Sequence, residues 1–382
     1  MTKFYGLKGN LLRINLTTKS SKTEKIDQEL WKNYLGGRGL GAYFLSKEVL
    51  PSINPYSGDS KLIFMIGPLG GTIIPGSDKI CVTFKSPLTE TYSYSLCGGN
   101  FGPELKYAGF DGLIIEGKSE DPLYLSINNN KVKFKTANHI WGNFIPESEE
   151  IIRKELGNDK TIQIAVIGPA GEKLCSYACI TSGYYREFGR GGAGAVMGSK
   201  MLKGIAIRGS QDVKVAQKKE VLEMTKRLIN NLRSSNAGKI RRIYGTMELV
   251  KRINEAGFWT TRNFSEGYFE EGYKLEGKQM RDEIIFSDSS CYGCPIACGK
   301  RTKILEDDGK EVIMEGPEFE TVGMLGSNLG ISNWKTLMEA AKICDSYGFD
   351  TINAGACISM MMEAFEKGKL TLKETDGIEM KF

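Results

Sequence analysis

Gly189-Arg-Gly-Gly-Ala-Gly-Ala-Val-Met-Gly198 is followed almost at once by the apolar run Leu202-Lys-Gly-Ile-Ala-Ile207. Three of its glycines match the G-x-G-x-x-G spacing of a dinucleotide-binding turn. Such a turn needs a strand before it, a full helix after it and an acidic residue about 20 residues further along. The short interval before Leu202 leaves little room for that helix. The stretch therefore disfavours a doubly wound dinucleotide fold, and a dinucleotide-dependent dehydrogenase stays a lesser alternative.

The residues around this stretch, 1–210, predict a β-rich domain. Residues 9–16 alternate apolar and polar side chains, as a half-buried strand does. Apolar runs bounded by Gly, Pro or Asp predict further strands at residues 61–66, 80–85, 112–116, 123–127, 132–135, 161–167 and 202–207. The triplet Asn128-Asn-Asn130 predicts a hairpin turn between two of them. Helices are expected near residues 27–47 and 146–156.

Beyond about residue 211, apolar residues recur at the spacing of helices instead of strands. The segments with this spacing are 218–232, 240–256, 334–347 and 353–367. We therefore predict an α+β fold with two domains. A β-rich domain occupies residues 1–210, and a mostly helical domain occupies residues 211–382.

The composition narrows the class of protein. The 382 residues carry a net charge of only +5, and no Lys/Arg block or aromatic-basic strip predicts nucleic-acid binding. No apolar run is long enough to span a bilayer, so no membrane association is predicted. The first eight residues lack the apolar core of a signal peptide. We therefore expect a cytoplasmic protein.

His139 is the only histidine of the chain. A histidine-ligated metal centre and a Ser/His or Cys/His nucleophilic pair are therefore nearly excluded. Any redox chemistry would then depend on an acquired cofactor. The flanking residues predict a structural loop position for His139.

Cys291-Tyr-Gly-Cys294-Pro-Ile-Ala-Cys298 places three thiols on one short segment. The Cys-x-x-Cys-x-x-x-Cys spacing is typical of iron–sulfur clusters. Tetrahedral zinc would accept the first two sulfurs, and buried or redox-active thiols are a third interpretation. Each kind of metal site needs a fourth ligand, and none lies nearby in the sequence. In a cytoplasmic chain, the nine cysteines predict metal binding, redox chemistry or burial before disulfides.

Two glycine-rich stretches predict close approach of the backbone to an anionic group. Glycine permits that approach, and exposed N–H groups bind phosphate oxygens. Arg186 and Arg190 flank the run that begins at Gly189, and arginines clamp phosphate. The sequence Cys97-Gly-Gly99 follows the same logic. A tight structural turn with solvated arginines remains the alternative.

The motifs together resemble those of the aldehyde:ferredoxin oxidoreductase family, and the resemblance covers nearly the whole chain. The order and spacing of the motifs carry it. They are Tyr34-Leu-Gly-Gly-Arg-Gly-Leu40, Ile66-Gly-Pro-Leu-Gly-Gly-Thr72, Lys85-Ser-Pro-Leu-Thr89, Gly98-Gly-Asn-Phe-Gly-Pro-Glu-Leu-Lys-Tyr-Ala-Gly109, Ile167-Gly-Pro-Ala-Gly-Glu172, the run from Gly189, the cysteine segment, Glu315-Gly-Pro-Glu-Phe-Glu320 and Asp345-Ser-Tyr-Gly-Phe-Asp350.

The resemblance implies a β-rich base domain that carries the cofactor, with two mostly helical domains above it. It implies a tungsten or molybdenum ion held by the dithiolene sulfurs of two pterins, so the protein need not ligate that metal. The implied reaction converts a small aldehyde and water to a carboxylic acid. Two electrons then leave through a [4Fe–4S] cluster to ferredoxin.

The resemblance also implies roles for individual residues. Cys291, Cys294 and Cys298 match three cluster ligands. Glu320 matches a glutamate close to the metal and is the candidate general acid/base, a role that needs a pKa raised by burial; a helix-capping loop carboxylate is the alternative. The positions that match pterin or phosphate contacts are Gly98, Arg186, Gly189, Arg190, Glu339, Asp345, Phe349 and Asp350, with Phe349 in place of the usual leucine.

Three positions depart from the family pattern. Lys79 stands where the family usually has an arginine that links cluster and pterin, and lysine loses the planar fork of hydrogen-bond donors. Leu96 replaces an asparagine at a magnesium-bridged phosphate site, a change that a backbone-carbonyl ligand would tolerate. Glu187 occupies a usually small position beside the same site. A magnesium ion is therefore an open part of the implied cofactor set.

The resemblance implies a third helical domain with a fourth cluster cysteine, and we expect that domain to lie outside the 382 residues. We expect either a fragment or a chain whose remaining part is supplied by a separate partner chain. A homodimer is also compatible with the sequence. Cys344 and Cys357 lie in helical patterns and are expected to be buried small side chains, not substitute ligands. A non-catalytic iron–sulfur electron-transfer or interaction subunit is the main functional alternative.

Overall fold

The computed structural model describes residues 5–305 and 309–382, and the chain divides into two compact units. The first unit contains the described part of Met1–Ile229, together with Cys291–Cys294 and Ser346–Phe349. The second contains the described parts of Asn230–Ser290, Pro295–Asp345 and Asp350–Phe382. Two short pieces that are late in the sequence therefore belong to the same unit as the N-terminal strands.

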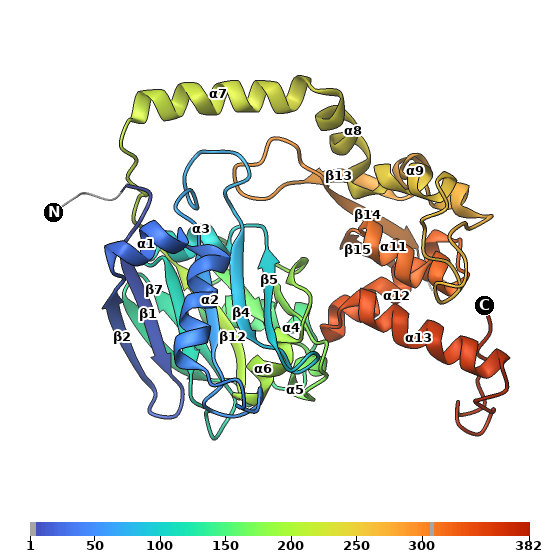
Figure 1. The fold of residues 1–382 in the computed structure, drawn as a ribbon, viewed down its shortest axis with the longest axis horizontal. Coiled ribbons are helices and arrows are strands. Elements are labelled where there is room, and N and C mark those ends of the chain that lie inside the picture. Colours follow the sequence, from blue (N-terminus) through green and yellow to red (C-terminus); the bar gives the residue numbers. More distant parts are fainter. Residues whose placement is uncertain (1–4, 306–308) are drawn as a thin grey trace. The chain divides into compact units, whose positions relative to one another are not determined.

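The first unit is built on two six-stranded sheets (Figure 1). The first sheet has the strand order β2-β1-β6-β3-β4-β5, and all its pairs are antiparallel except β1 with β6. Its strands are β1 (Asn10–Asn15), β2 (Ser20–Lys25), β3 (Leu62–Ile66), β4 (Ile80–Lys85), β5 (Tyr92–Cys97) and β6 (Gly112–Glu116).

The second sheet has the strand order β11-β10-β9-β12-β7-β8. Only β12 and β7 run parallel. Its strands are β7 (Leu123–Asn128), β8 (Lys131–Thr136), β9 (Gln163–Val166), β10 (Ile180–Ser182), β11 (Arg186–Phe188) and β12 (Leu202–Arg208). The predicted turn at residues 128–130 joins β7 and β8 as an antiparallel hairpin.

The main core lies between these two sheets, because apolar side chains from both sheets form one buried cluster. Phe64 of β3 packs edge-on against Phe188 of β11, with ring centroids 5.5 Å apart. Each fully buried apolar side chain of this kind contributes roughly 1.5–3 kcal/mol to folding. The core therefore holds β11 firmly, and with it the arginine at its start.

Helices cover parts of the outer faces of the sheets. Trp31 of α1 (Gln28–Tyr34) and Leu40 of α2 (Gly37–Glu48) pack on the first sheet. Gly36 connects the two helices with φ +106°, and a Cβ there would lie 2.7 Å from the Ile66 carbonyl oxygen, so the turn requires glycine. Ile152 of α4 (Ile145–Glu155) packs on the second sheet. Two shorter helices of this unit are α3 (Phe101–Tyr107) and α5 (Pro169–Glu172).

The segment from β11 through α6 (Ala193–Ser199) to β12 does not form a dinucleotide-binding unit. Three antiparallel pairings separate the two strands in the sheet, so β11 and β12 point in opposite directions. A dinucleotide fold needs two parallel strands joined by a long helix, and α6 has seven residues. The arrangement is therefore the one that the short interval before Leu202 predicted.

The second unit is mostly helical and includes a small antiparallel sheet of order β13-β14-β15. α7 (Lys218–Ser234) contains the boundary between the two units. The later elements are α8 (Asn236–Tyr244), α9 (Leu249–Glu255), α10 (Gly277–Glu283), β13 (Ile285–Ser289), β14 (Gly299–Leu305), β15 (Glu311–Glu315), α11 (Phe319–Leu325), α12 (Trp334–Tyr347) and α13 (Thr351–Glu366).

The predicted α+β class is confirmed, and two details differ from the predictions. The sheet β13-β14-β15 was not predicted, and the helical pattern at 240–256 is broken into α8 and α9 at Gly245, where φ is +61°. Cys344 is buried as expected, but Cys357 is exposed, so that expectation was wrong. Among the residues that the structure describes, no helix is both long and apolar enough to cross a membrane.

Candidate functional site

The turn between β5 and α3 is formed by Gly98 and Gly99. Gly99 has φ +89°, a left-handed conformation that favours glycine. A Cβ at Gly98 would lie 2.9 Å from the Cys291 Sγ and 3.0 Å from the Asp78 Oδ2. A larger residue at position 98 would have to displace these two side-chain ends. The turn therefore brings its backbone directly against the thiol of the cysteine segment.

Two cations and one buried carboxylate surround the same turn. The Lys79 Nζ is 3.1 Å from the Cβ position of Gly98, and the Arg186 Cγ is 3.1 Å from that of Gly99. Asp78 is buried, and its carboxylate accepts a hydrogen bond of 3.2 Å from the Gly99 N–H. The sequence predicted roles for Lys79 and Arg186, and the structure brings both to the Gly98–Gly99 turn.

These charges act on the cysteine side chains. Burial raises the pKa of the Cys291 thiol, while the positive charges of Arg186 and Lys79 act in the opposite direction. Burial also raises the pKa of the Cys97 thiol, again opposed by the same two cations. The thiolate is the form that binds iron, and nearby cations favour it. The donor chemistry beside Cys291 therefore fits a thiolate-ligated group.

The cysteine segment is tied to the turn by its main chain. The Tyr292 N–H donates to the Gly99 carbonyl at 3.3 Å, and the Cys294 N–H donates to the Cys291 carbonyl at 3.1 Å. Cys298 belongs to the second unit. Within residues 5–305 and 309–382, no group of three or more His, Cys, Asp or Glu side chains is arranged to hold a metal ion.

The glycines of the run from 189 to 198 serve two different purposes. Gly192 has φ +86°, and a Cβ there would lie 2.1 Å from the Ser176 carbonyl oxygen. Cβ atoms at Gly194 and Gly198 would lie 2.2 and 2.0 Å from backbone carbonyl oxygens. These three are required by packing. Gly189 differs, because a Cβ there meets open space and its φ lies outside the left-handed range.

The structure thus offers no internal reason for glycine at position 189. A group that approaches the backbone from outside supplies one, so the site fits the anionic cofactor group that the sequence predicted. Arg190 follows directly and is exposed, and its N–H donates to the Ser95 Oγ at 3.3 Å. Arg186 and Glu187 lie on β11, with the Glu187 carboxylate 3.5 Å from the Thr181 hydroxyl.

Part of the motif at residues 345–350 belongs to the first unit. Phe349 stacks on Tyr347 with ring centroids 5.8 Å apart, and its ring lies 5.7 Å from that of Tyr177. Phe349 also forms an isolated β-bridge with Ala178. The aromatic side chain that replaces the usual leucine therefore fixes this segment by ring packing.

The two aspartates of that motif belong to the second unit. Asp345 lies near the end of α12, and although the residue keeps some exposed surface, burial of its carboxyl group raises its pKa to about 7. Asp350 is buried and caps α13, because its carboxylate accepts a 3.0 Å hydrogen bond from the Ile352 N–H. Asp350 therefore has a structural role that the sequence analysis did not assign to it.

Two of the remaining predicted positions, Glu320 and Glu339, belong to the second unit, and Leu96 lies on β5, two residues before Gly98. Glu320 is in the first turn of α11 and is exposed, so the burial that a general acid/base role needs is not present. Glu339 lies partly buried within α12. Leu96 is exposed on β5, on the opposite face of the strand from Cys97.

Three residues of the site escaped the sequence analysis, namely Asp78, Tyr107 and Tyr292. The Tyr107 and Tyr292 hydroxyls lie 2.6 Å apart. Tyr292 lies inside the cysteine segment, and that position is a signal that was available. His139 lies in a loop as predicted, with its Nε2 2.5 Å from the Glu155 carboxylate.

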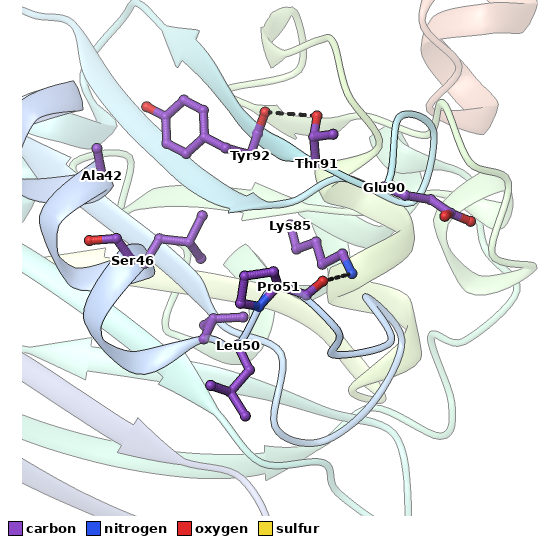
Figure 2. A pocket seen from close by; sticks show the side chains of 10 residues that line it. Ala42, Ser46, Leu50, Pro51, Lys85, Glu90, Thr91 and Tyr92 are labelled. Atoms are coloured by element: carbon purple, nitrogen blue, oxygen red, sulfur yellow. Dashed lines mark hydrogen bonds between the residues drawn. The ribbon is translucent and has the colours of Figure 1, made fainter.

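A pocket of about 320 Å³ lies elsewhere on the first unit (Figure 2). It is formed by α2 and the turn between β4 and β5, where the Lys85 Nζ donates to the Pro51 carbonyl at 2.6 Å. Among the described residues, none of the predicted site residues lines it. The candidate site therefore comprises the Gly98–Gly99 turn and Gly189, and this pocket is not part of it.

Comparison with known proteins identifies the family. The family model described as "Aldehyde ferredoxin oxidoreductase, N-terminal domain" matches residues 11–209, and "Aldehyde ferredoxin oxidoreductase, domains 2 & 3" matches residues 223–382. The chain is 43% identical to the tungsten-containing aldehyde ferredoxin oxidoreductase of Pyrococcus furiosus, over 97% of this chain and 60% of that protein. The enzyme of that name from Thermococcus kodakarensis is 44% identical over 96% of this chain and 60% of its own length.

A solved structure agrees with these sequence matches. The active-site complex BamBC of benzoyl-coenzyme A reductase, bound to 1,5-dienoyl-CoA, superposes with a TM-score of 0.84 at 30% identity. The superposition covers 98% of this chain and 58% of that one. The chain thus spans about 60% of the length of the curated relatives named above. On the matched residues and the shared fold together, this chain belongs to the aldehyde ferredoxin oxidoreductase family.

Proposed function

We propose that this chain takes part in the oxidation of an aldehyde to a carboxylic acid, with ferredoxin as the electron acceptor. The reaction consumes one aldehyde and one water and yields a carboxylate, three protons and two electrons. The names of the curated relatives support an aldehyde as substrate, tungsten as the metal and ferredoxin as the electron acceptor. When bound, the bis-pterin metal group supplies the two-electron chemistry, and a [4Fe–4S] cluster supplies the route outward.

In this proposal, the first unit binds and orients the phosphate side of the pterin group. Gly98, Gly99 and Gly189 allow close backbone approach, and Gly189 has the open space that this requires. Arg186 and Arg190 bind phosphate oxygens through charge-assisted hydrogen bonds. Any magnesium ion there would be held at positions 96 and 187, through the Leu96 backbone carbonyl and beside the Glu187 carboxylate.

The cysteine segment holds the iron–sulfur cluster through Cys291, Cys294 and Cys298. Lys79, beside the Gly98–Gly99 turn, places a positive charge near the Cys291 thiolate and favours its ionised form. Because lysine replaces an arginine with a planar fork, it acts here as a point charge.

The remaining residues with proposed roles are Asp345, Phe349, Asp350, Glu339 and Glu320. Asp345 and Asp350 accept hydrogen bonds from pterin N–H groups when their carboxylates are ionised, with Phe349 setting the spacing and Glu339 adding a further contact. Glu320 moves a proton to or from the substrate oxygen. That role requires Glu320 to lose solvent when cofactor and substrate bind, because it is exposed in this structure.

The observation that supports the proposal most is the convergence at the Gly98–Gly99 turn. A thiol, a lysine ammonium and an arginine side chain all lie about 3 Å from positions that a Cβ would occupy. Residues of three chain regions meet at a backbone turn in which Gly99 has a left-handed φ that favours glycine. A structural turn alone would not require this combination of a metal-binding thiol and two cations.

The test is metal analysis of the anaerobically purified chain, followed by activity assays. We expect iron together with tungsten or molybdenum, and aldehyde-dependent reduction of ferredoxin. A cofactor-loaded chain that reduces ferredoxin with no aldehyde would contradict the proposal. So would a preparation that contains neither metal under conditions in which a tungsten-containing relative is loaded.

Two other functions are separated by the same experiment. Iron with neither tungsten nor molybdenum would favour a non-catalytic iron–sulfur electron-transfer subunit. The solved relative is a benzoyl-coenzyme A reductase complex, so an aromatic acyl thioester belongs in the substrate panel. Turnover of that thioester, without turnover of aldehydes, would replace aldehyde oxidation by thioester chemistry as the function.

A further inference from the structure

Tyr292 lies between Cys291 and Cys294 and is held at two points. Its N–H donates to the Gly99 carbonyl at 3.3 Å. Its hydroxyl lies 2.6 Å from the hydroxyl of Tyr107, the last residue of α3. The two rings meet edge-on with centroids 6.3 Å apart. The segment is therefore anchored through both its backbone and its side chain.

The hydrogen-bond directions follow from counting protons. The Tyr107 hydroxyl has one proton, and it donates that proton to the Gly71 carbonyl at 2.8 Å. It can then only accept from Tyr292, so the Tyr292 hydroxyl is the donor of the pair. The chain of hydrogen bonds therefore runs from Tyr292 to Tyr107 to the Gly71 carbonyl.

Both ends of this chain of hydrogen bonds rest on fixed turns. Gly71 has φ +72°, and a Cβ there would lie 3.3 Å from the Tyr107 ring, so turn and ring are packed together. On the other side, the buried Asp78 carboxylate holds the Gly99 N–H at 3.2 Å. Burial raises the pKa of Tyr107, which keeps its hydroxyl protonated.

We propose that Tyr107 and Tyr292 are positioning residues that hold Cys291 and Cys294 in place for the iron–sulfur cluster. This inference rests on the proposed function, because it takes these two cysteines as cluster ligands. Removing a group that hydrogen-bonds to and orients a metal ligand typically weakens metal binding about 10–100-fold. The two tyrosines would orient the cysteines in this way, since neither tyrosine is itself proposed as a cluster ligand.

The asymmetry of the donors makes a specific pattern of mutant effects. Tyr292→Phe removes one hydrogen bond, because Tyr107 keeps its bond to the Gly71 carbonyl. Tyr107→Phe removes both hydrogen bonds. The double variant should therefore behave like Tyr107→Phe alone, since the Tyr292 hydroxyl has no remaining acceptor. Tyr56→Phe is the matched control, because the Tyr56 hydroxyl likewise donates to a backbone carbonyl, that of Leu174 at 3.1 Å.

The first measurement is the rate at which cluster-loaded protein loses iron to a chelator. The electron paramagnetic resonance spectrum of the reduced cluster is recorded for the same variants. We expect loss about tenfold faster in Tyr292→Phe, and faster still in Tyr107→Phe, with shifted spectra in both. Tyr56→Phe should match the wild type. The unfolding midpoint of Tyr292→Phe should stay close to that of Tyr56→Phe. Equal iron loss and unchanged spectra in all variants would overturn the positioning role.

The second measurement uses the metal-free chain and keeps the two proposals apart. Alkylation of Cys291 and Cys294 is followed by mass spectrometry, with the exposed Cys357 as internal reference. Loss of one anchoring hydrogen bond of about 1 kcal/mol should speed alkylation of the segment by about fivefold in Tyr292→Phe, and leave Cys357 unchanged. If the wild type binds no iron but this effect is seen, the cluster assignment fails and the anchoring holds. If alkylation is unchanged, the anchoring fails whatever the iron content.

Discussion

Lys200 is a fully buried lysine held by backbone carbonyls. Its Nζ donates to the carbonyls of Ser60 at 2.5 Å and Gly117 at 3.0 Å, with two longer contacts to the turn at 57–58. Burial lowers its pKa to about 8. The buried ammonium therefore joins segments that are far apart in the sequence, although its charged form is disfavoured by the loss of water.

This geometry predicts a pH dependence of stability. The folded chain releases the Lys200 proton near pH 8, whereas the unfolded chain keeps it up to about pH 10.4. The unfolded state thus binds more protons between these values, so the Lys200 contribution to the free energy of unfolding rises with pH there. We therefore expect the free energy of unfolding of the wild type, relative to that of Lys200→Met, to rise by about 3 kcal/mol at most between pH 7.5 and 10.5. Urea unfolding at pH 7.5, 9 and 10.5 measures this difference. A constant difference across these pH values would contradict this.

Gly189 and Gly192 form a matched pair at the same scale. Gly192→Ala should destabilise the chain by about 2–4 kcal/mol, because its Cβ would collide with a carbonyl oxygen at a left-handed φ. Gly189→Ala should leave the midpoint of thermal unfolding unchanged but lower the tungsten or molybdenum content of the purified chain. Normal metal loading in Gly189→Ala would remove position 189 from the cofactor site.

At the scale of elements, two variants of Asp350 at the start of α13 distinguish its capping role from its proposed pterin-binding role. Asp350→Ala removes the cap and should cost about 1 kcal/mol in unfolding free energy. Asp350→Asn keeps a capping oxygen and should be nearly neutral for stability. Both variants should bind the pterin group more weakly if the ionised carboxylate is what it needs. Retention of full metal content by Asp350→Asn would show that capping is the residue's whole role.

The strands and helices differ in how far the sequence predicted them. The strand β3 was predicted because its run of residues is apolar throughout. In the structure every residue of β3 is buried. The strands β13, β14 and β15 were missed, since their apolar runs are no longer than three residues and are bounded by polar or charged residues. A sheet of that kind is set by pairing across the strands, which no local pattern reports.

At the scale of the whole molecule, metal loading should stabilise the folded chain. A group bound by the folded state alone adds about 2.7 kcal/mol at a free concentration of 100 Kd. For a unit of this size each kcal/mol shifts the unfolding temperature by about 2–4 °C. Calorimetry before and after removal of iron should therefore show a lower midpoint in the stripped sample. An unchanged midpoint would mean that iron is not held by the folded site.

The sequence by itself determined the fold class, the family and the identity of the chemical groups. Periodicity reports which residues face a core, and motif order reports the family, because both are local properties of the chain. Only the tertiary structure decided which groups meet. Tyr107 and Tyr292 are 185 positions apart, and Asp78 reaches the Gly98–Gly99 turn across the β4–β5 hairpin. Such contacts depend on how sheets and turns pack together, and the cost and gain of that packing appear in no single stretch of sequence.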